Sequence, residues 1–167
     1  MKRIAAVVLT AALVLTACQS ASEKLSEQII EQAEGVDDVD INTDTGEVNI
    51  ETDEGSISIG GGEIPEDLAV PLPDGYSVMS VFTSPEGSAV SVTYEPNRWD
   101  ELISHFGSWT DGQSGDWTTS SSSFESGNGQ TQRMHGWYGE TTSVTVSDCL
   151  IDSGDTFDGV CVSVISN

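Results

Sequence analysis

Basic side chains are scarce in this sequence. Its 167 residues include five lysines and arginines against 28 aspartates and glutamates, which gives a formal net charge of −23. Nucleic-acid recognition depends on cations that neutralise phosphates, so this balance excludes DNA and RNA as natural partners. Cationic proteins, cationic peptides or divalent ions are the expected electrostatic partners, and solubility in a salty or calcium-rich exterior is the alternative explanation of the charge.

Long apolar runs are also missing, apart from one near the amino terminus. Residues 4–15, "IAAVVLTAALVL", are uncharged but too few to cross a bilayer, which takes about 20 apolar residues as a helix. Lys2 and Arg3 precede this run, and small residues then lead into Cys18 in the stretch "LTAC". A basic start, a short apolar core and small residues are typical of an export signal rather than of a membrane helix.

The stretch "LTAC" in this position resembles the lipobox of bacterial lipoproteins. The resemblance implies that residues 1–17 are a cleaved signal peptide and that Cys18 becomes the first residue and carries lipid, with acyl chains such as palmitate. Each buried CH₂ contributes about 0.8 kcal/mol, so two or three chains hold a protein firmly. We therefore expect a lipid anchor in the cell membrane, with the chain on the extracytoplasmic side of the cell envelope.

Cysteine is scarce as well, with three residues, an odd number for an exported chain. If Cys18 carries lipid, Cys149 and Cys161 remain as a pair, and export permits their oxidation. Placing these two cysteines directly opposite each other in the last two strands sets Val146 against Val164 and sorts the apolar side chains onto one face. The sequence therefore predicts a disulfide hairpin, while a redox-active or metal-binding pair, which lacks a C-x-x-C spacing, is the alternative.

Residues 18–59 have the pattern of a small lipid-anchored unit. Residues 22–33 predict a short helix with one apolar stripe, and alternating apolar residues after it predict a three-stranded antiparallel meander. The helix is expected to cover the apolar face of the meander, and a disordered acidic tether is the alternative. The alternating residues are Val39 and Ile41, Val48 and Ile50, and Ile57 and Ile59.

Residues 60–75, "GGGEIPEDLAVPLPDG", carry four glycines and three prolines. This composition predicts an extended Gly/Pro-rich linker between two folded parts. The predicted helix, the meander and this stretch together resemble uncharacterised secreted lipoproteins of bacteria. That resemblance implies no activity.

Residues 76–167 contain all four tryptophans and predict an α+β domain. A hairpin over "SPEG" is followed by a helix whose apolar face includes Trp99, Leu102 and Phe106, and then by four strands. The expected fold class is therefore α+β: an N-terminal helix with a small antiparallel β-meander, then an antiparallel sheet with one packed helix in ββαββββ order.

A weak metal candidate lies in "DINTDTGEVNIE". Asp40, Asn42, Asp44 and Glu51 have spacings that resemble those of an EF-hand loop. Gly46 comes one place late for that loop, however, and the residues after it continue a strand. A hairpin with a bulge at Gly46 is therefore the favoured interpretation, and no metal or other cofactor is expected.

Aromatic residues near the second histidine form the candidate binding surface, with burial in the core as the alternative. No P-loop, dinucleotide fingerprint, zinc-protease motif or nucleophile elbow occurs. The favoured hypothesis is a non-enzymatic binding or accessory module for an unknown envelope protein or glycan. The alternatives are an envelope hydrolase with a site near His135 and a weak calcium-binding surface protein. The candidate surface residues are Trp109, Trp117, His135, Trp137 and Tyr138.

Overall fold

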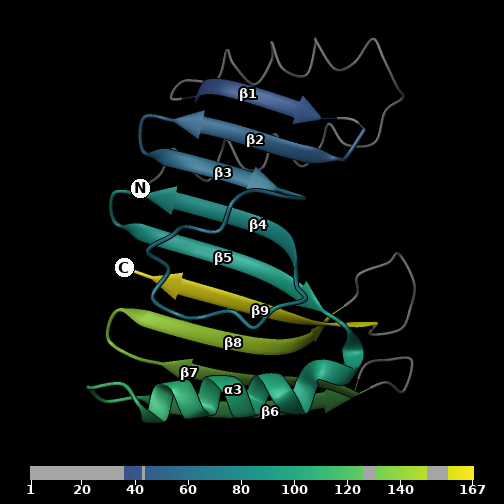
Figure 1. Ribbon diagram of the computed structural model, residues 1–167, viewed down its shortest axis with the longest axis vertical. Coiled ribbons are helices and arrows are strands. Elements are labelled where there is room, and N and C mark those ends of the chain that lie inside the picture. Colours follow the sequence, from purple (N-terminus) through teal and green to yellow (C-terminus); the bar gives the residue numbers. More distant parts are fainter. Residues whose placement is uncertain (1–35, 43, 126–130, 150–157) are drawn as a thin grey trace.

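Antiparallel pairing joins the strands that the structure describes into one nine-stranded sheet, drawn in Figure 1. The computed structural model describes residues 36–42, 44–125, 131–149 and 158–167. The strands follow the order β1-β2-β3-β4-β5-β9-β8-β7-β6 across the sheet. Their bounds are β1 (Val36–Asn42), β2 (Glu47–Thr52), β3 (Gly55–Ile59), β4 (Ser77–Ser84), β5 (Gly87–Tyr94), β6 (Thr118–Glu125), β7 (Thr131–Tyr138), β8 (Thr142–Cys149) and β9 (Gly159–Ser166).

The predicted fold class, an N-terminal helix with a meander followed by a separate ββαββββ sheet, is wrong. The described chain is mainly antiparallel β. Strand β3 pairs directly with β4, so the predicted meander and the strands after residue 76 belong to one sheet. The alternation of apolar residues marks strands but does not say which strand edges meet, so the sequence left this junction open. The helix predicted at residues 22–33 lies outside the described residues.

The apolar face of the sheet changes sides along the strand order. We call the face covered by the helix the front and the other face the back. Directly paired residues share a face, and Val90 of β5 pairs with Val81 of β4, which in turn pairs with Ser58 of β3. The same row continues through Asn49 of β2 to Asp40 of β1. The front is therefore apolar around β5 and polar on β1–β3.

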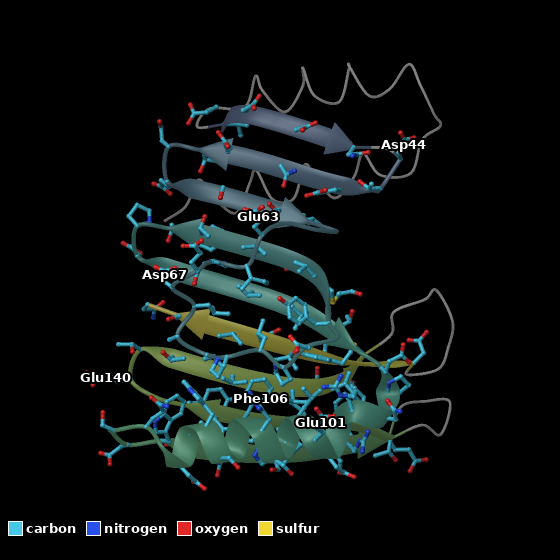
Figure 2. All side chains as sticks on the ribbon, in the orientation of Figure 1. Asp44, Glu63, Asp67, Glu101, Phe106 and Glu140 are labelled. Carbon is cyan, nitrogen blue, oxygen red and sulfur yellow. A yellow bond between two sulfur atoms is a disulfide. The ribbon has the colours of Figure 1, made fainter. Side chains whose placement is uncertain are left out.

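The main core fills the front of β5, β9 and β8. Its central valines include Val92, Val146 and Val162, each 0% exposed. The helix α3 (Trp99–Asp111) lies across this end of the sheet and buries Leu102 and Phe106 against it; Figure 2 labels Phe106 between the helix and the strands. Across the described ranges, no helix combines the length and apolarity that a membrane crossing requires.

Residues 60–75 form neither helix nor strand and run over the front of the sheet, as Figure 1 shows. Val70 within this segment is 1% exposed and belongs to the core. Arg98, at the end of the short 3-10 turn η1 (Pro96–Arg98), donates a hydrogen bond to the Asp74 carbonyl and forms a 2.6 Å ion pair with Glu101. The segment therefore adds a layer to the core as well as connecting β3 to β4.

The predicted disulfide between Cys149 and Cys161 is present, with a Cα–Cα distance of 5.7 Å. The predicted register, however, is wrong by two residues. Val144 rather than Val146 lies opposite Val164, and Cys149 lies opposite Gly159, so the disulfide crosses diagonally between β8 and β9. A slip of two residues keeps every side chain on its face, which is why the apolar pattern could not distinguish the two registers.

Candidate functional site

A groove of about 330 Å³ opens where α3 passes over β6 and β7. The helix forms one wall, the outer strand β6 forms the other, and β7 forms the floor. The side chains and backbone around it offer an aromatic ring, hydroxyls, an imidazole and a guanidinium. The lining residues are Trp99, Ile103, Ser121, Ser122, Ser123, Arg133, Met134 and His135.

An ion pair between Arg133 and Asp148 forms part of this floor. The two residues come next after the Met134–Ser147 pair of the β7–β8 ladder, and the Arg133 Nε and Nη2 atoms lie 2.9 and 2.7 Å from the carboxylate oxygens. The backbone N–H of Arg133 donates a third bond, of 2.8 Å. Burial would raise the pKa of Asp148, but the hydrogen bonds and charge of Arg133 outweigh it and hold that pKa below its usual range.

Trp99 fixes the other side of the same guanidinium. The Arg133 Cζ atom lies 4.1 Å from the centroid of the Trp99 ring, a cation–π contact that links α3 to β7. Asp100, exposed on the helix, also acts electrostatically on Arg133 and helps to raise its pKa, after the larger effect of the Asp148 bond. The Arg133 side chain is still 45% exposed, so it faces the groove as well as its partners.

His135 lies in the groove and pairs with a serine from the neighbouring strand. Ser121 and His135 are directly opposed in the β6–β7 register, and the Ser121 Oγ atom lies 2.6 Å from the His135 Nδ1 atom. The imidazole packs at a tilt against Trp137, with ring centroids 4.3 Å apart. Within the described part of the chain, His135 has no hydrogen bond to a carboxylate, which the hydrolase hypothesis required.

The other candidate surface residues lie apart from the groove. Trp137 is 4% exposed in the core, where its ring contacts Phe106. Trp109 and Trp117 contact each other edge to face, with centroids 5.4 Å apart, and pack against the core. Tyr138 is 41% exposed on the back of β7. Of the five residues expected to form one surface, only His135 lines the groove.

The weak metal candidates form a hairpin between β1 and β2. The Asn42 side-chain oxygen accepts hydrogen bonds from the N–H groups of Asp44 and Thr45, and Gly46 has a positive φ of 77°. Across the described residues, no group of three or more histidine, cysteine or carboxylate side chains could hold a metal ion. Asp40 and Glu51, the remaining candidates, pair with Asn49 and Asp38 respectively across the ladder. Cys18 lies outside the described residues.

One feature of the sequence, the position of Asp148, could have predicted part of the groove. Asp148 follows Val144 and Val146 at the same alternating positions of β8, so a carboxylate occurs where the core pattern calls for an apolar residue. A carboxylate at such a position needs a cation, and few are available in this chain. Trp99 was predicted only as part of an apolar helix face. The sequence did not single out the β6 serines as groove residues, because serine is abundant throughout the segment.

Comparison with known proteins adds nothing to this geometry: no family model, no curated protein and no solved structure matches the chain. Function therefore has to be argued from the groove and its surroundings, since a fold alone does not determine what a protein does.

Proposed function

We propose that this protein is a lipid-anchored, acidic protein of the cell envelope, and that it acts as a non-enzymatic binding or accessory module through the groove beside β6 and β7. The observation that carries the proposal is the groove itself, about 330 Å³ in volume. This volume is at the lower end of the usual range for ligand sites, which suits a short stretch of a polymer better than a large cofactor.

The groove chemistry favours a ligand with polar groups and does not favour an anion. Asp148 neutralises Arg133, so the floor offers donors and acceptors rather than a net positive charge for phosphate. The Ser121 and Ser123 hydroxyls add to this set on the β6 wall, and the His135 ring adds to it on the floor. Peptide backbone and glycan hydroxyls both match such groups, and an envelope protein or glycan is the ligand class we propose.

The lipid anchor is argued from the first eighteen residues, and two further observations agree with it. The disulfide between Cys149 and Cys161 belongs in an oxidising compartment. The net charge of −23 would repel the body from anionic lipid headgroups, so that it stands away from the membrane surface. Replacing Cys18 by alanine should move the protein from the membrane fraction to the soluble fraction. Full membrane attachment of Cys18→Ala would overturn the anchor.

A bulky substitution that fills the groove tests its role in binding. Ser123 lines the groove, and Ser120, on the same strand, faces the back of the sheet outside it. We expect the envelope component that co-purifies with the lipidated wild type to be lost from Ser123→Tyr and retained by Ser120→Tyr. Equal retention by both variants would contradict a binding role for the groove.

The close approach of Ser121 and His135 supports a second candidate, an envelope hydrolase. A hydroxyl 2.6 Å from an imidazole is the start of a nucleophile–base pair, although a catalytic site also needs a group that orients the base. Hydrolysis of p-nitrophenyl acetate by the wild type, Ser121→Ala and His135→Ala separates the two functions. The binding proposal expects equal rates for all three proteins, and a wild-type rate lost in both variants would favour the hydrolase.

A further inference from the structure

Strand β6 forms one edge of the sheet, and within the described residues it has none of the usual protection of an edge. All of its residues, "TTSSSSFE", are exposed. The strand contains no proline, and its single charged residue, Glu125, stands at its end. Natural proteins normally guard edge strands with charges, prolines, bulges or short length, because a bare edge can pair with another chain.

The opposite edge of the same sheet is guarded. Strand β1 carries Asp37, Asp38 and Asp40, and its pairing with β2 shifts register between Val36 and Asp38. Charges and an irregular ladder both discourage the addition of another strand. In the part of the chain that the structure describes, one edge is therefore guarded and the other is open beside the groove.

The turn between β7 and β8 shows which backbone groups of β7 face each neighbour. The N–H of Gly139 donates to the Thr142 carbonyl at 2.8 Å, so this pair is hydrogen-bonded and the pairs that follow alternate along the ladder. It follows that the backbone groups of Trp137 and His135 face β8. The bond from the Arg133 N–H to Asp148 on β8 agrees with this alternation.

The intervening residues of β7 then bond to β6. Gly136 pairs with Ser120 and Met134 pairs with Ser122, so the backbone N–H and C=O groups of these two serines are used within the sheet. The backbone groups of Thr119, Ser121 and Ser123 alternate with them and point outward from the edge. They offer a regular row of donors and acceptors to an incoming strand.

We infer that β6 receives an extended segment of a cationic partner polypeptide, which adds as a further strand to the sheet. The inference rests on the proposed binding role, because the Ser121 and Ser123 side chains line the groove and would border the added strand. The backbone row supplies the hydrogen bonds, and alternate side chains of the partner extend along the groove.

Charge selects a cationic partner over a second copy of the chain. The whole sequence carries a net charge of −23, so two copies repel each other, whereas a basic segment is attracted. Within the described residues the arginines are Arg98 and Arg133, and each is paired with a carboxylate. Asp100 near Arg133 and Glu125 at the end of β6 add acidic groups close to this edge.

Amide hydrogen exchange on the disulfide-intact protein tests this inference. The probe is a synthetic Lys-Thr-Val-Thr repeat, compared with the same repeat carrying glutamate for lysine and with a peptide copy of residues 118–125. We expect the lysine repeat to slow exchange at Thr119, Ser121 and Ser123 by about tenfold or more, with little change at Ser120 and Ser122. Added salt should weaken this effect.

A matched pair of variants tests the backbone contact. Thr119 does not line the groove, and its N–H points outward, so proline there removes a donor from the open edge while sparing the β6–β7 ladder. Thr119→Pro should weaken binding of the lysine repeat about tenfold, and Thr119→Ala by less than about twofold. Should Thr119→Pro fail to fold, the alternating exchange pattern of the wild type decides.

Three results would overturn the inference: equal binding of the lysine repeat by Thr119→Pro and Thr119→Ala, no alternating protection in β6, or stronger binding of the residue 118–125 copy than of the lysine repeat. The last result would identify a second copy as the occupant.

If Ser123→Tyr abolishes co-purification while the lysine repeat protects nothing, the groove proposal stands and strand addition fails. If the lysine repeat protects β6 and Ser123→Tyr has no effect, strand addition stands and the groove proposal fails.

Discussion

Strands β1–β3 and strands β5, β9 and β8 belong to one sheet but carry their apolar side chains on opposite faces. On β5, β9 and β8 the front bears valines that are almost wholly buried beneath α3 and residues 60–75. On β1–β3 the front is polar, and the back carries Val48, Ile50 and Ile57 in register. These three residues are only partly buried, and Ile59 on the same face is 50% exposed, although Val39 of β1, opposite Ile50, is 5% exposed.

Strand β4 makes this change of face possible. Val81 points to the front and is 5% exposed, while its neighbour Phe82 points to the back, opposite Ile57, and is 42% exposed. Backbone hydrogen bonds join strands without regard to which face is apolar, so a strand with apolar residues on both faces can connect two differently packed parts. Shared pairing therefore does not imply equal packing, and stability should differ between the two parts.

The largest expected effect comes from the front core beneath the helix. Phe106 is 0% exposed, and Phe106→Ala should lower the free energy of unfolding by about 4 kcal/mol, because it removes buried area and leaves a cavity. Phe82→Ala on the exposed back should cost less than about 1 kcal/mol. Urea unfolding of the unlipidated chain measures both values. Similar costs for the two phenylalanines would contradict the difference in packing.

The sequence predicted local structure better than assembly, and the reason is the same in each case. Period-two alternation located the meander, because it depends only on neighbouring residues of one strand. The pairing of β3 with β4 depends on residues 60–75 folding across the sheet, and composition described these residues only as extended. Register at the disulfide was wrong by two residues, since the alternation repeats every two.

The groove was harder still to predict, since its walls come from segments distant in sequence. Trp99 on α3 contacts Arg133 on β7, and Ser121 on β6 contacts His135. The aromatic residues around His135 indicated β7, which does line the groove. Trp137 and Tyr138 are consecutive on this strand, however, and so point to opposite faces of the sheet. Contacts of this kind follow from tertiary packing, which no local pattern encodes.

The second prediction concerns the ion pair at the groove. Asp148→Asn should lower the free energy of unfolding at neutral pH by about 2 kcal/mol, because it weakens charge-assisted bonds to a buried carboxylate. The pKa of Asp148 is lower in the folded chain than in the unfolded chain, so the stabilisation is fully present above about pH 4 and is lost as the pH falls further. The difference between wild type and variant should therefore shrink in acid.

Unfolding curves between neutral pH and strong acid measure this dependence. Asp37 is exposed on β1 at the other end of the sheet, and Asp37→Asn should change stability by less than about 0.5 kcal/mol at neutral pH. A constant difference between wild type and Asp148→Asn down to the lowest pH would show that the carboxylate charge is not what stabilises the groove.

The smallest expected difference, about 1.5 kcal/mol between two valines, tests the comparison most directly, because the same substitution is made on both parts of the sheet. Val48→Ala on the back of β2 should cost about 1 kcal/mol, since Val48 is only half-buried, whereas Val162→Ala in the front core of β9 should cost about 2.5 kcal/mol. Residues 22–33 are predicted to cover the back of β1–β3. If they pack as tightly as α3 packs on the front, the two substitutions will lower the free energy of unfolding by the same amount. The two parts of the sheet would then be equally well packed on opposite faces.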